Sequence, residues 1–275
     1  MQSLPEIKAI LTERGLRPRH RFGQNFLIEP VHLRRIVEAA AVKPGDTILE
    51  VGPGTGTLTE ELLAGGARVV ASEIDRDLAS LVRDRLGASI QLVEGDVLSA
   101  KRAIAPAVLA AIGDDAFKLV ANLPYQIASP LLAILAGDPR CHGCFVTVQR
   151  EVADRLGAGP GTPDYGPLSV VVQSRFSVSR LADLPPGCFW PPPKVTSAMV
   201  AMEPRPDPSV PLEHLDGFGR FVQSIFGKRR KQLGAIVGRS VPLPEGIDPA
   251  IRPESLPIED WVRLWTVLRR DAAPG

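Results

Sequence analysis

Two kinds of hydrophobic pattern alternate along residues 47–156 and predict a β-α-β arrangement. Short, almost continuously apolar runs are typical of strands buried on both faces. We expect such strands at 47–51, 67–75, 89–96, 117–122 and from residue 144. Helically spaced apolar residues separate them, at 58–66, at 78–86 and in the second half of 144–156. Strands that alternate with helices of this length predict a mostly parallel sheet with helices on both faces, an α/β fold.

The pattern changes after residue 160. There we expect one or two strands within 168–181, an irregular proline-rich segment at 185–195, a last strand at 197–204, a linker at 205–211, and helices within 214–238 and 258–270. This order predicts two domains. Residues 1–205 hold the sheet, and residues 206–275 form a small α-helical domain.

Composition excludes several classes of protein. The chain is 44% hydrophobic and 23% charged, which is typical of a globular protein and not of a disordered or fibrous one. No run approaches the roughly 20 apolar residues that a membrane span needs, and the N-terminus lacks the apolar core of a secretion signal. Three cysteines are too few for a disulfide framework, and the pair Cys141 and Cys144 lacks a matching second pair. We therefore expect a cytoplasmic protein without a metal site.

The charge is nearly balanced overall but unevenly distributed. A net charge of +1 excludes a uniformly basic nucleic-acid binder. Residues 1–44 nevertheless carry eight basic against four acidic residues, and residues 220–240 carry six basic residues and no acidic one. Two basic patches on a neutral chain favour a protein that binds a polyanion with part of its surface.

A glycine-rich turn and three acidic residues at strand ends indicate the cofactor. The turn Glu50–Gly56 lacks the last glycine of a dinucleotide fingerprint, because Thr57 stands there. The acidic residue at its start would repel a pyrophosphate but suits an ammonium group. Glu73 ends the second strand, where a carboxylate can accept both ribose hydroxyls, and Asp96 ends the third, where it can accept from an adenine amino group. A nucleoside with an amino-acid tail and no phosphate is S-adenosylmethionine.

The segment Asn122-Leu123-Pro124-Tyr125 ends the fourth strand and indicates the reaction. The Asn122 side-chain oxygen and the Leu123 carbonyl can accept the two N–H bonds of an adenine amino group. Positive charge develops on that nitrogen as it attacks a methyl group, and two oriented carbonyl dipoles stabilise it. Pro124 stiffens the turn, and Tyr125 offers a stacking face for a base taken out of its helix.

Several segments, in this order along the chain, resemble those of a known family. The segments that carry the resemblance are HRFGQNFL (20–27), EVGPGTGTLT (50–59), EID (73–75), GDVL (95–98), NLPY (122–125), FWPPPKVTS (189–197) and FGKRRKQL (226–233). Together they are similar to the ribosomal RNA adenine dimethyltransferases, and most to the bacterial small-subunit group. The resemblance runs from about residue 17 to the C-terminus.

This resemblance implies a Rossmann-like S-adenosylmethionine methyltransferase sheet with a helical second domain that helps to bind RNA. It implies a predicted cofactor set of Gln24, Asn25, Leu27, Gly52, Gly54, Glu73, Ile74, Asp96, Val97 and Asn122. It implies that Phe189 sandwiches the target adenine against Tyr125. The expected RNA contacts are Arg17, Arg19, Arg21, Arg229, Arg230 and Lys231.

The favoured hypothesis is a monomeric enzyme that dimethylates N6 of two adjacent adenines near the 3′ end of 16S rRNA, within the small ribosomal subunit or its assembly intermediate. A related alternative is a methyltransferase of the large-subunit RNA, of the macrolide-resistance type. An alternative of another class is a non-catalytic assembly factor of the small subunit. A small-molecule methyltransferase is disfavoured, because it would leave the basic C-terminal segment without a role.

Overall fold

The computed structural model describes residues 1–99, 103–238 and 241–271, and the chain divides into two compact units. The first unit is Met1–Ala153 with Ser179–Glu203, and the second is Asp154–Val178 with Pro204–Gly275. One division therefore lies close to residue 205, where the boundary is expected. Residues 154–178, which lie within the predicted first domain, belong to the second unit.

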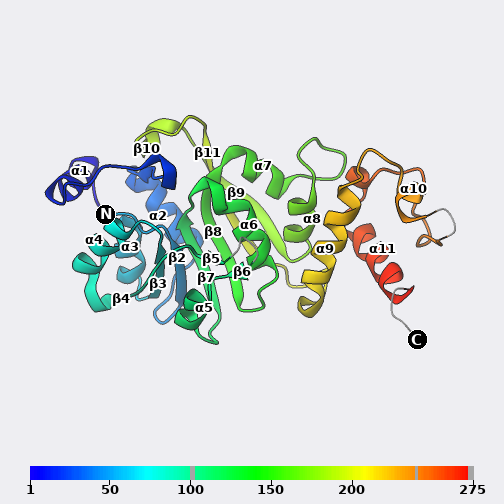
Figure 1. Cartoon of the computed structure of the whole chain (residues 1–275), viewed down its shortest axis with the longest axis horizontal. Helices are drawn as coiled ribbons and strands as arrows, with labels where there is room; N and C mark the ends of the chain where they lie inside the picture. Colours follow the sequence, from blue (N-terminus) through cyan, green and yellow to red (C-terminus); the bar gives the residue numbers. More distant parts are fainter. Residues whose placement is uncertain (100–102, 239–240, 272–275) are drawn as a thin grey trace. The chain divides into compact units, whose positions relative to one another are not determined.

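A seven-stranded sheet forms the centre of the first unit (Figure 1). Its strands are β2 (Thr47–Val51), β3 (Arg68–Glu73), β4 (Ile90–Glu94), β7 (Phe117–Asn122), β8 (Cys141–Gln149), β9 (Phe176–Leu184) and β11 (Ser197–Pro204), in the order β4-β3-β2-β7-β8-β11-β9. The first five strands of that order are parallel, and β11 runs antiparallel to β8. The predicted α/β sheet is confirmed.

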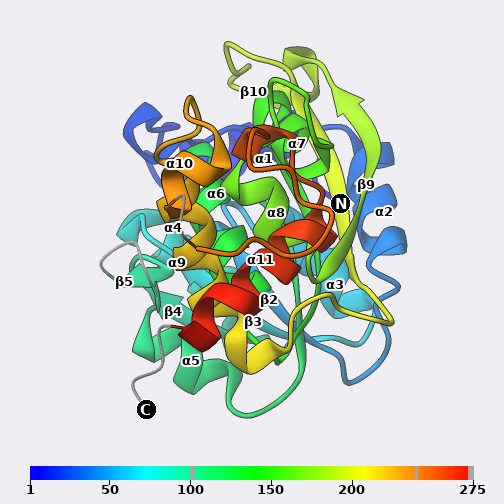
Figure 2. The same ribbon diagram turned by 90° about the vertical axis from the view of Figure 1, so that its right-hand side faces the viewer.

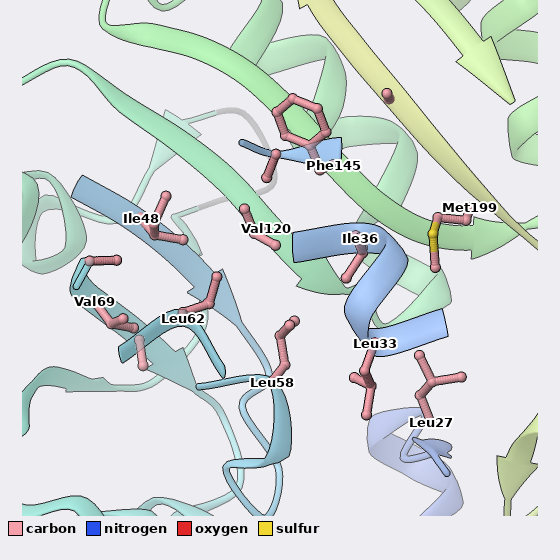
Figure 3. Packing of buried hydrophobic residues seen from close by; sticks show 14 of the residues in the cluster. Leu27, Leu33, Ile36, Ile48, Leu58, Leu62, Val69, Val120, Phe145 and Met199 are labelled. Carbon is pink, nitrogen blue, oxygen red and sulfur yellow. The ribbon is translucent and has the colours of Figure 1, made fainter. Parts of the chain in front are cut away.

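Both faces of the sheet are buried, which explains the continuous apolar runs. Side chains alternate between the faces, so that Ile48 and its neighbour Leu49 are both fully buried. On one face Ile48, Val69 and Val120 pack against Ile36 and Leu62 from two helices (Figure 3). The first unit's helices are α1 (Leu4–Glu13), α2 (Pro30–Ala39), α3 (Thr57–Ala64), α4 (Arg76–Leu86), α5 (Pro106–Ile112) and α6 (Tyr125–Ala136).

Short elements complete the first unit. They are β1 (Phe26–Leu27), β5 (Leu98–Ser99), β6 (Ala103–Ile104), β10 (Phe189–Trp190), and the 3-10 turns His20–Phe22, Gly87–Ser89 and Pro186–Cys188. The proline-rich segment at 185–195 is thus less irregular than expected. Its β10 pairs antiparallel with β1, with Leu27 opposite Phe189. This long-range pairing satisfies backbone groups that no local pattern in the segment could satisfy.

The second unit is helical (Figure 2). It contains most of α7 (Arg150–Gly157), and α8 (Pro167–Gln173), α9 (Leu215–Phe226), α10 (Leu233–Val237) and α11 (Ile258–Asp271), with 3-10 turns at Leu212–His214 and Pro253–Ser255. Phe218, Val222 and Leu264 are among its fully buried residues. Trp261 lies in the same core and stacks on Phe226, with 5.0 Å between ring centroids.

Of the one or two strands expected within 168–181, β9 is confirmed from Phe176 onward, whereas residues 167–173 form the helix α8. The β-branched run Val170–Val172 favours a strand locally, but Pro167 occupies the first helical turn and Val170 and Val172 are fully buried. Because α8 packs against α9, the tertiary contact overrides the local preference. The Tyr165 hydroxyl also donates to the Leu256 carbonyl at 2.7 Å, which ties this segment to the second unit.

No helix in the described part of the chain is both long and apolar enough to cross a membrane.

Candidate functional site

A cavity of about 370 Å³ opens at the carboxyl ends of β2, β3, β4 and β7. Open α/β sheets bind their ligands at this edge. All members of the predicted cofactor set line it: Gln24, Asn25, Leu27, Gly52, Gly54, Glu73, Ile74, Asp96, Val97 and Asn122. Of the residues predicted to act in catalysis, Asn122 and Pro124 line it, whereas Leu123, Tyr125 and Phe189 are not among its lining residues.

The glycine-rich turn after β2 forms one wall of the cavity. Gly52 and Gly54 both have positive φ, at 73° and 63°, a conformation that side-chain-bearing residues rarely adopt. A Cβ on Gly54 would lie 2.9 Å from Cε1 of Phe26. Glycine at this position therefore allows both the turn and the close approach of β1.

Two buried carboxyl groups flank this turn, Glu50 near the end of β2 and Glu73 at the end of β3. Burial raises the pKa of Glu73 to about 7 and that of Glu50 to about 8, and the charge of Glu73 adds to the shift at Glu50. Glu73 accepts the backbone N–H of Asp75 at 2.9 Å and that of Gly54 at 3.4 Å. Oε2 of Glu50 is buried and has no hydrogen-bond partner in the described residues. An orphaned carboxylate oxygen of this kind suits a ligand with a cationic or hydrogen-bond-donating group.

The residues that follow β3 and β4 give the cavity both polar and apolar lining. The Asp96 side chain is exposed, and Oδ1 accepts the backbone N–H of Leu98 at 2.9 Å. The neighbouring Val97 is buried, whereas Ile74 beyond β3 is 44% exposed although it is apolar. A planar ring that covers Ile74 would remove this apolar surface from water.

The Asn122 amide is held in one orientation. Its Nδ2 donates to the backbone carbonyl of Asn25 at 2.8 Å, which leaves Oδ1 as the acceptor of this side chain. The next peptide is also held, because the Leu123 N–H donates to the Thr147 carbonyl at 3.1 Å. Pro124 then precedes Tyr125, the first residue of α6.

The two aromatic residues expected to sandwich a base lie in different environments. Tyr125 is half-buried, and its hydroxyl shares a hydrogen bond of 2.7 Å with Ser197. Phe189 is only 2% exposed and packs in the core with Leu27 and Leu184, contrary to its predicted role against a ligand. Phe189 lies in β10 opposite Leu27, and it is not among the residues that line the cavity, although Leu27 is.

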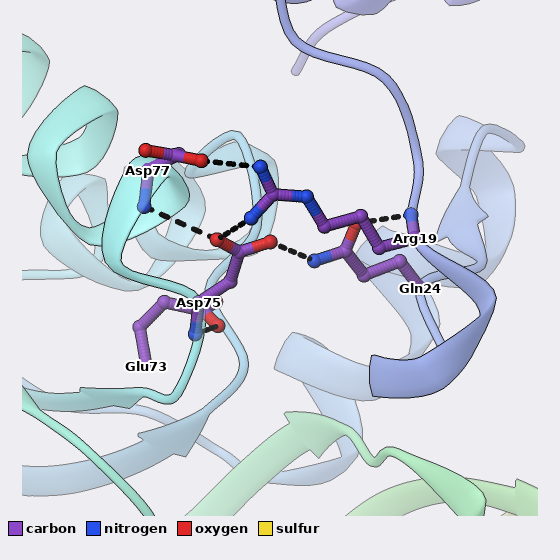
Figure 4. Close-up of polar contacts among 5 residues, drawn as sticks. All are labelled: Arg19, Gln24, Glu73, Asp75 and Asp77. Atoms are coloured by element: carbon purple, nitrogen blue, oxygen red, sulfur yellow. Dashed lines mark hydrogen bonds and ion pairs between the residues drawn. The ribbon is translucent and has the colours of Figure 1, made fainter.

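A polar clasp, consisting of Arg19, Gln24, Asp75 and Asp77, holds the N-terminal segment against the end of β3 (Figure 4). The Arg19 guanidinium pairs with Asp75 at 2.7 Å and also with Asp77. Gln24 Nε2 donates to the other Asp75 oxygen at 2.8 Å. Arg19 was predicted to contact RNA, but its guanidinium is already held by two carboxylates.

The other predicted RNA contacts are exposed. Arg17 and Arg21 lie on the N-terminal segment, and Arg21 also lines the cavity. Arg229, Arg230 and Lys231 lie in the turn between α9 and α10, and none of the three forms an ion pair within the described residues.

Sequence reasoning missed Asp75 and Ser197 as members of the site. Asp75 accepts the Asp77 N–H at the start of α4, and it is 3% exposed. An aspartate directly before a helix has that capping role as its ordinary explanation, so the pattern alone carries no signal for the clasp. Ser197 ends the segment FWPPPKVTS that helps to carry the family resemblance, but it lies 72 residues from Tyr125, and no local pattern indicates their contact.

Comparison with known proteins agrees with this geometry. Residues 15–269 match the family model described as ribosomal RNA adenine dimethylase. A ribosomal RNA small subunit methyltransferase A from Anaeromyxobacter dehalogenans is 41% identical, over 94% of this chain and 96% of the relative. One from Magnetococcus marinus is 38% identical over the full length of both chains.

Two solved structures share the fold. A dimethyladenosine transferase from Plasmodium falciparum has a TM-score of 0.73 and 26% identity, over 90% of this chain and 98% of that one. The 23S rRNA methyltransferase ErmE has a TM-score of 0.68 and 26% identity, over 89% of this chain and 100% of that one. The chain therefore belongs to the ribosomal RNA adenine dimethylase family, whose members are S-adenosylmethionine-dependent methyltransferases.

Proposed function

We propose that this protein dimethylates N6 of two adjacent adenines in a hairpin loop near the 3′ end of 16S rRNA. The observation that carries the proposal is the cavity that joins the buried carboxyl groups behind β2 and β3 to the oriented Asn122 amide. Relatives named for the small subunit are 38–41% identical to this chain, whereas the large-subunit enzyme ErmE is 26% identical. This difference favours the small subunit as the substrate.

The residues of the cavity fit S-adenosylmethionine. Glu73 would accept the ribose hydroxyls, Asp96 the adenine amino group, and the exposed side chain of Ile74 would cover the adenine ring. The carboxyl group of Glu50, with its orphaned oxygen, suits the cationic end of the molecule. When bound, S-adenosylmethionine supplies an activated methyl group.

The NLPY segment would hold the acceptor adenine. Oδ1 of Asn122 and the Leu123 carbonyl accept the two amino hydrogens, and their dipoles stabilise the positive charge that develops on N6. Tyr125 provides a stacking face for the flipped base, a contact worth roughly 1–3 kcal/mol. Phe189 can join this stack only if it leaves the core, because it is 2% exposed.

Exposed basic residues would bind the RNA backbone. We assign this role to Arg17, Arg21, Arg229, Arg230 and Lys231, as phosphate contacts that position the RNA without reading its sequence. Arg19 is left out, because Asp75 and Asp77 bind it. We further propose that the enzyme acts as a monomer in the cytoplasm, where ribosomal subunits assemble.

Labelled S-adenosylmethionine and under-methylated ribosomal particles of both sizes test the proposal. After incubation, the RNA is digested and its nucleosides are separated. Label in N6,N6-dimethyladenosine from the small subunit alone is the expected result. Label in the large subunit would contradict the proposed substrate, and tight particle binding without any label would favour an assembly factor.

Cofactor affinity is expected to fall as the pH falls below about 8, where Glu50 gains a proton, and more steeply below about 7. Since burial raises the pKa of Glu73 to about 7, the group gains a proton in this range and becomes a poor acceptor for ribose hydroxyls. Affinity then decreases up to about tenfold per pH unit for one coupled proton. Calorimetric titration between pH 5.5 and 8.5 measures this, and binding should release protons near neutral pH. An affinity that stays constant across the range would contradict the role of Glu73.

Opening the clasp is expected to weaken cofactor binding without unfolding the protein. Arg19→Ala removes the ion pairs of a half-exposed guanidinium, so we expect a roughly 3- to 10-fold loss of affinity. The difference from the wild type should shrink as the salt concentration rises, because salt screens these ion pairs. Asp75→Asn should cost more, because Asp75 is buried. Arg14→Ala is a matched control. It removes the 2.6 Å ion pair with Asp84, which lies on α4 like Asp77. Neither Arg14 nor Asp84 lines the cavity, so this variant should bind the cofactor normally.

A further inference from the structure

The Tyr125 hydroxyl has a specific partner outside the NLPY segment. Its 2.7 Å hydrogen bond reaches Oγ of Ser197, the first residue of β11, which is fully buried. Ser197 is the last residue of the segment FWPPPKVTS (189–197), whose first residue is Phe189. The tyrosine hydroxyl is thus bonded to the last residue of this segment.

The two ends of this hydrogen bond belong to one rigid framework. Ser197 lies opposite Gln149 in the antiparallel pairing of β11 with β8. Two residues earlier on β8, Thr147 lies opposite Asn122, and its carbonyl accepts the Leu123 N–H. Strand β8 therefore connects the anchor of the Tyr125 ring with the two carbonyl groups proposed to hold the amino group of the substrate.

A hydrogen bond at the hydroxyl restricts the ring at the end farthest from the backbone. Tyr125 is half-buried, and burial raises the pKa of its phenol, so the hydroxyl is a neutral group that needs a partner. Without the partner, the ring can rotate about its side-chain bonds and the hydroxyl must find water. With it, the ring plane keeps a constant position relative to Asn122.

We propose that Ser197 is a positioning residue that holds the Tyr125 ring where it stacks on the target adenine. This inference rests on the proposed function. Ser197 would act through the tyrosine hydroxyl, and it is not among the residues that line the cofactor cavity. Loss of the bond should therefore change the step in which the adenine is held and methylated, and leave cofactor affinity unchanged.

A double-mutant cycle tests the coupling. The variants are Ser197→Ala, Tyr125→Phe and the double variant, measured by single-turnover methylation of under-methylated small subunits. Each single variant is expected to react about 5-fold more slowly, as the loss of one neutral hydrogen bond predicts, and the double variant no more slowly than either. Independent effects that multiply in the double variant, or no effect in either single variant, would overturn the inference.

A spectroscopic readout separates positioning from general damage to the fold. The chain has two tyrosines, so that incorporation of 3-fluorotyrosine gives two fluorine resonances, and Tyr165→Phe identifies the one from Tyr125. Ser197→Ala should shift the Tyr125 resonance and leave that of Tyr165 in place. Ser174→Ala, a matched buried serine whose hydroxyl donates to Val171, should change neither the Tyr125 resonance nor the rate. An unmoved Tyr125 resonance in a folded Ser197→Ala protein would overturn the inference.

The Tyr125→Phe variant and a further variant, Tyr125→Ala, keep the test independent of folding and of the proposed function. If Ser197→Ala does not fold, Tyr125→Phe alone decides, because it removes the same bond from the other side and must still slow the reaction. Tyr125→Ala removes the ring itself. Full activity in Tyr125→Ala would reject the stacking role in the proposed function, whereas its inactivity together with normal rates for Tyr125→Phe would reject only the role of Ser197.

Discussion

Replacement of Glu73 by alanine is expected to weaken S-adenosylmethionine binding by at least about 100-fold in a protein that remains folded. Hydrogen bonds to a charged group contribute roughly 1.5–3 kcal/mol each, and the ribose offers two hydroxyls to this carboxylate. Folding should survive, because burial raises the pKa of Glu73 to about 7 and alanine removes a group whose charge the interior disfavours. Calorimetric titration with the cofactor measures the loss.

Two further variants show whether the loss of affinity is specific to the Glu73 carboxylate. Glu73→Gln keeps the shape and one acceptor oxygen but loses the charge, so its affinity should lie between those of wild type and alanine. Glu38→Ala removes an exposed carboxylate on α2 and should bind the cofactor normally. Unchanged affinity in Glu73→Ala would contradict the assignment of the cavity to this cofactor.

Replacement of Asn122 by alanine is expected to lower the rate of methyl transfer by about 100- to 1,000-fold, the cost of removing one oriented dipole from a developing charge. The structure gives the reason for so large an effect. The amide nitrogen is bonded to the Asn25 carbonyl, so the oxygen is preorganised as the acceptor before the substrate arrives. Single-turnover methylation of under-methylated small subunits at saturating cofactor measures this step.

Asn122→Asp helps to interpret that loss. It retains acceptor oxygens but replaces the donor to Asn25 with an atom that the carbonyl repels, so it should retain more activity than alanine and less than wild type. Cofactor affinity should fall far less in either variant than in Glu73→Ala. A wild-type rate for Asn122→Ala would show that the amide takes no part in the reaction.

Much of the sheet and of the cavity could be predicted from local pattern. Strands buried on both faces require continuous apolar runs, and parallel strands bring their carboxyl ends to one edge. Glu73 and Asp96 follow successive strands in the sequence, so the topology by itself brings them together. For that reason, residues separated by more than 20 positions could be assigned to one cavity without knowledge of any contact.

Prediction failed where the decisive partner lies far away in the sequence. The valine-rich run after Pro167 looks like a strand, but packing against α9 makes it a helix. Phe189 looks accessible in a proline-rich segment, yet its pairing with Leu27 buries it. Arg19 looks like a phosphate contact, and only the folded chain shows the carboxylates that already bind it.

The amino-acid sequence by itself determined the α/β class of this protein, the edge of the sheet that binds the ligand, and the residue types that line the cavity. The fold class follows from periodicity, and the acidic residues at the strand ends follow from their chemistry, whereas the rest of the cofactor set is implied by the family resemblance. Only the tertiary structure decided which way the Asn122 amide faces, which residue bonds to the Tyr125 hydroxyl, and that Arg19 is paired with two carboxylates. Such properties depend on hydrogen bonds and ion pairs between distant residues, and a partner that is not adjacent in the chain leaves no local pattern.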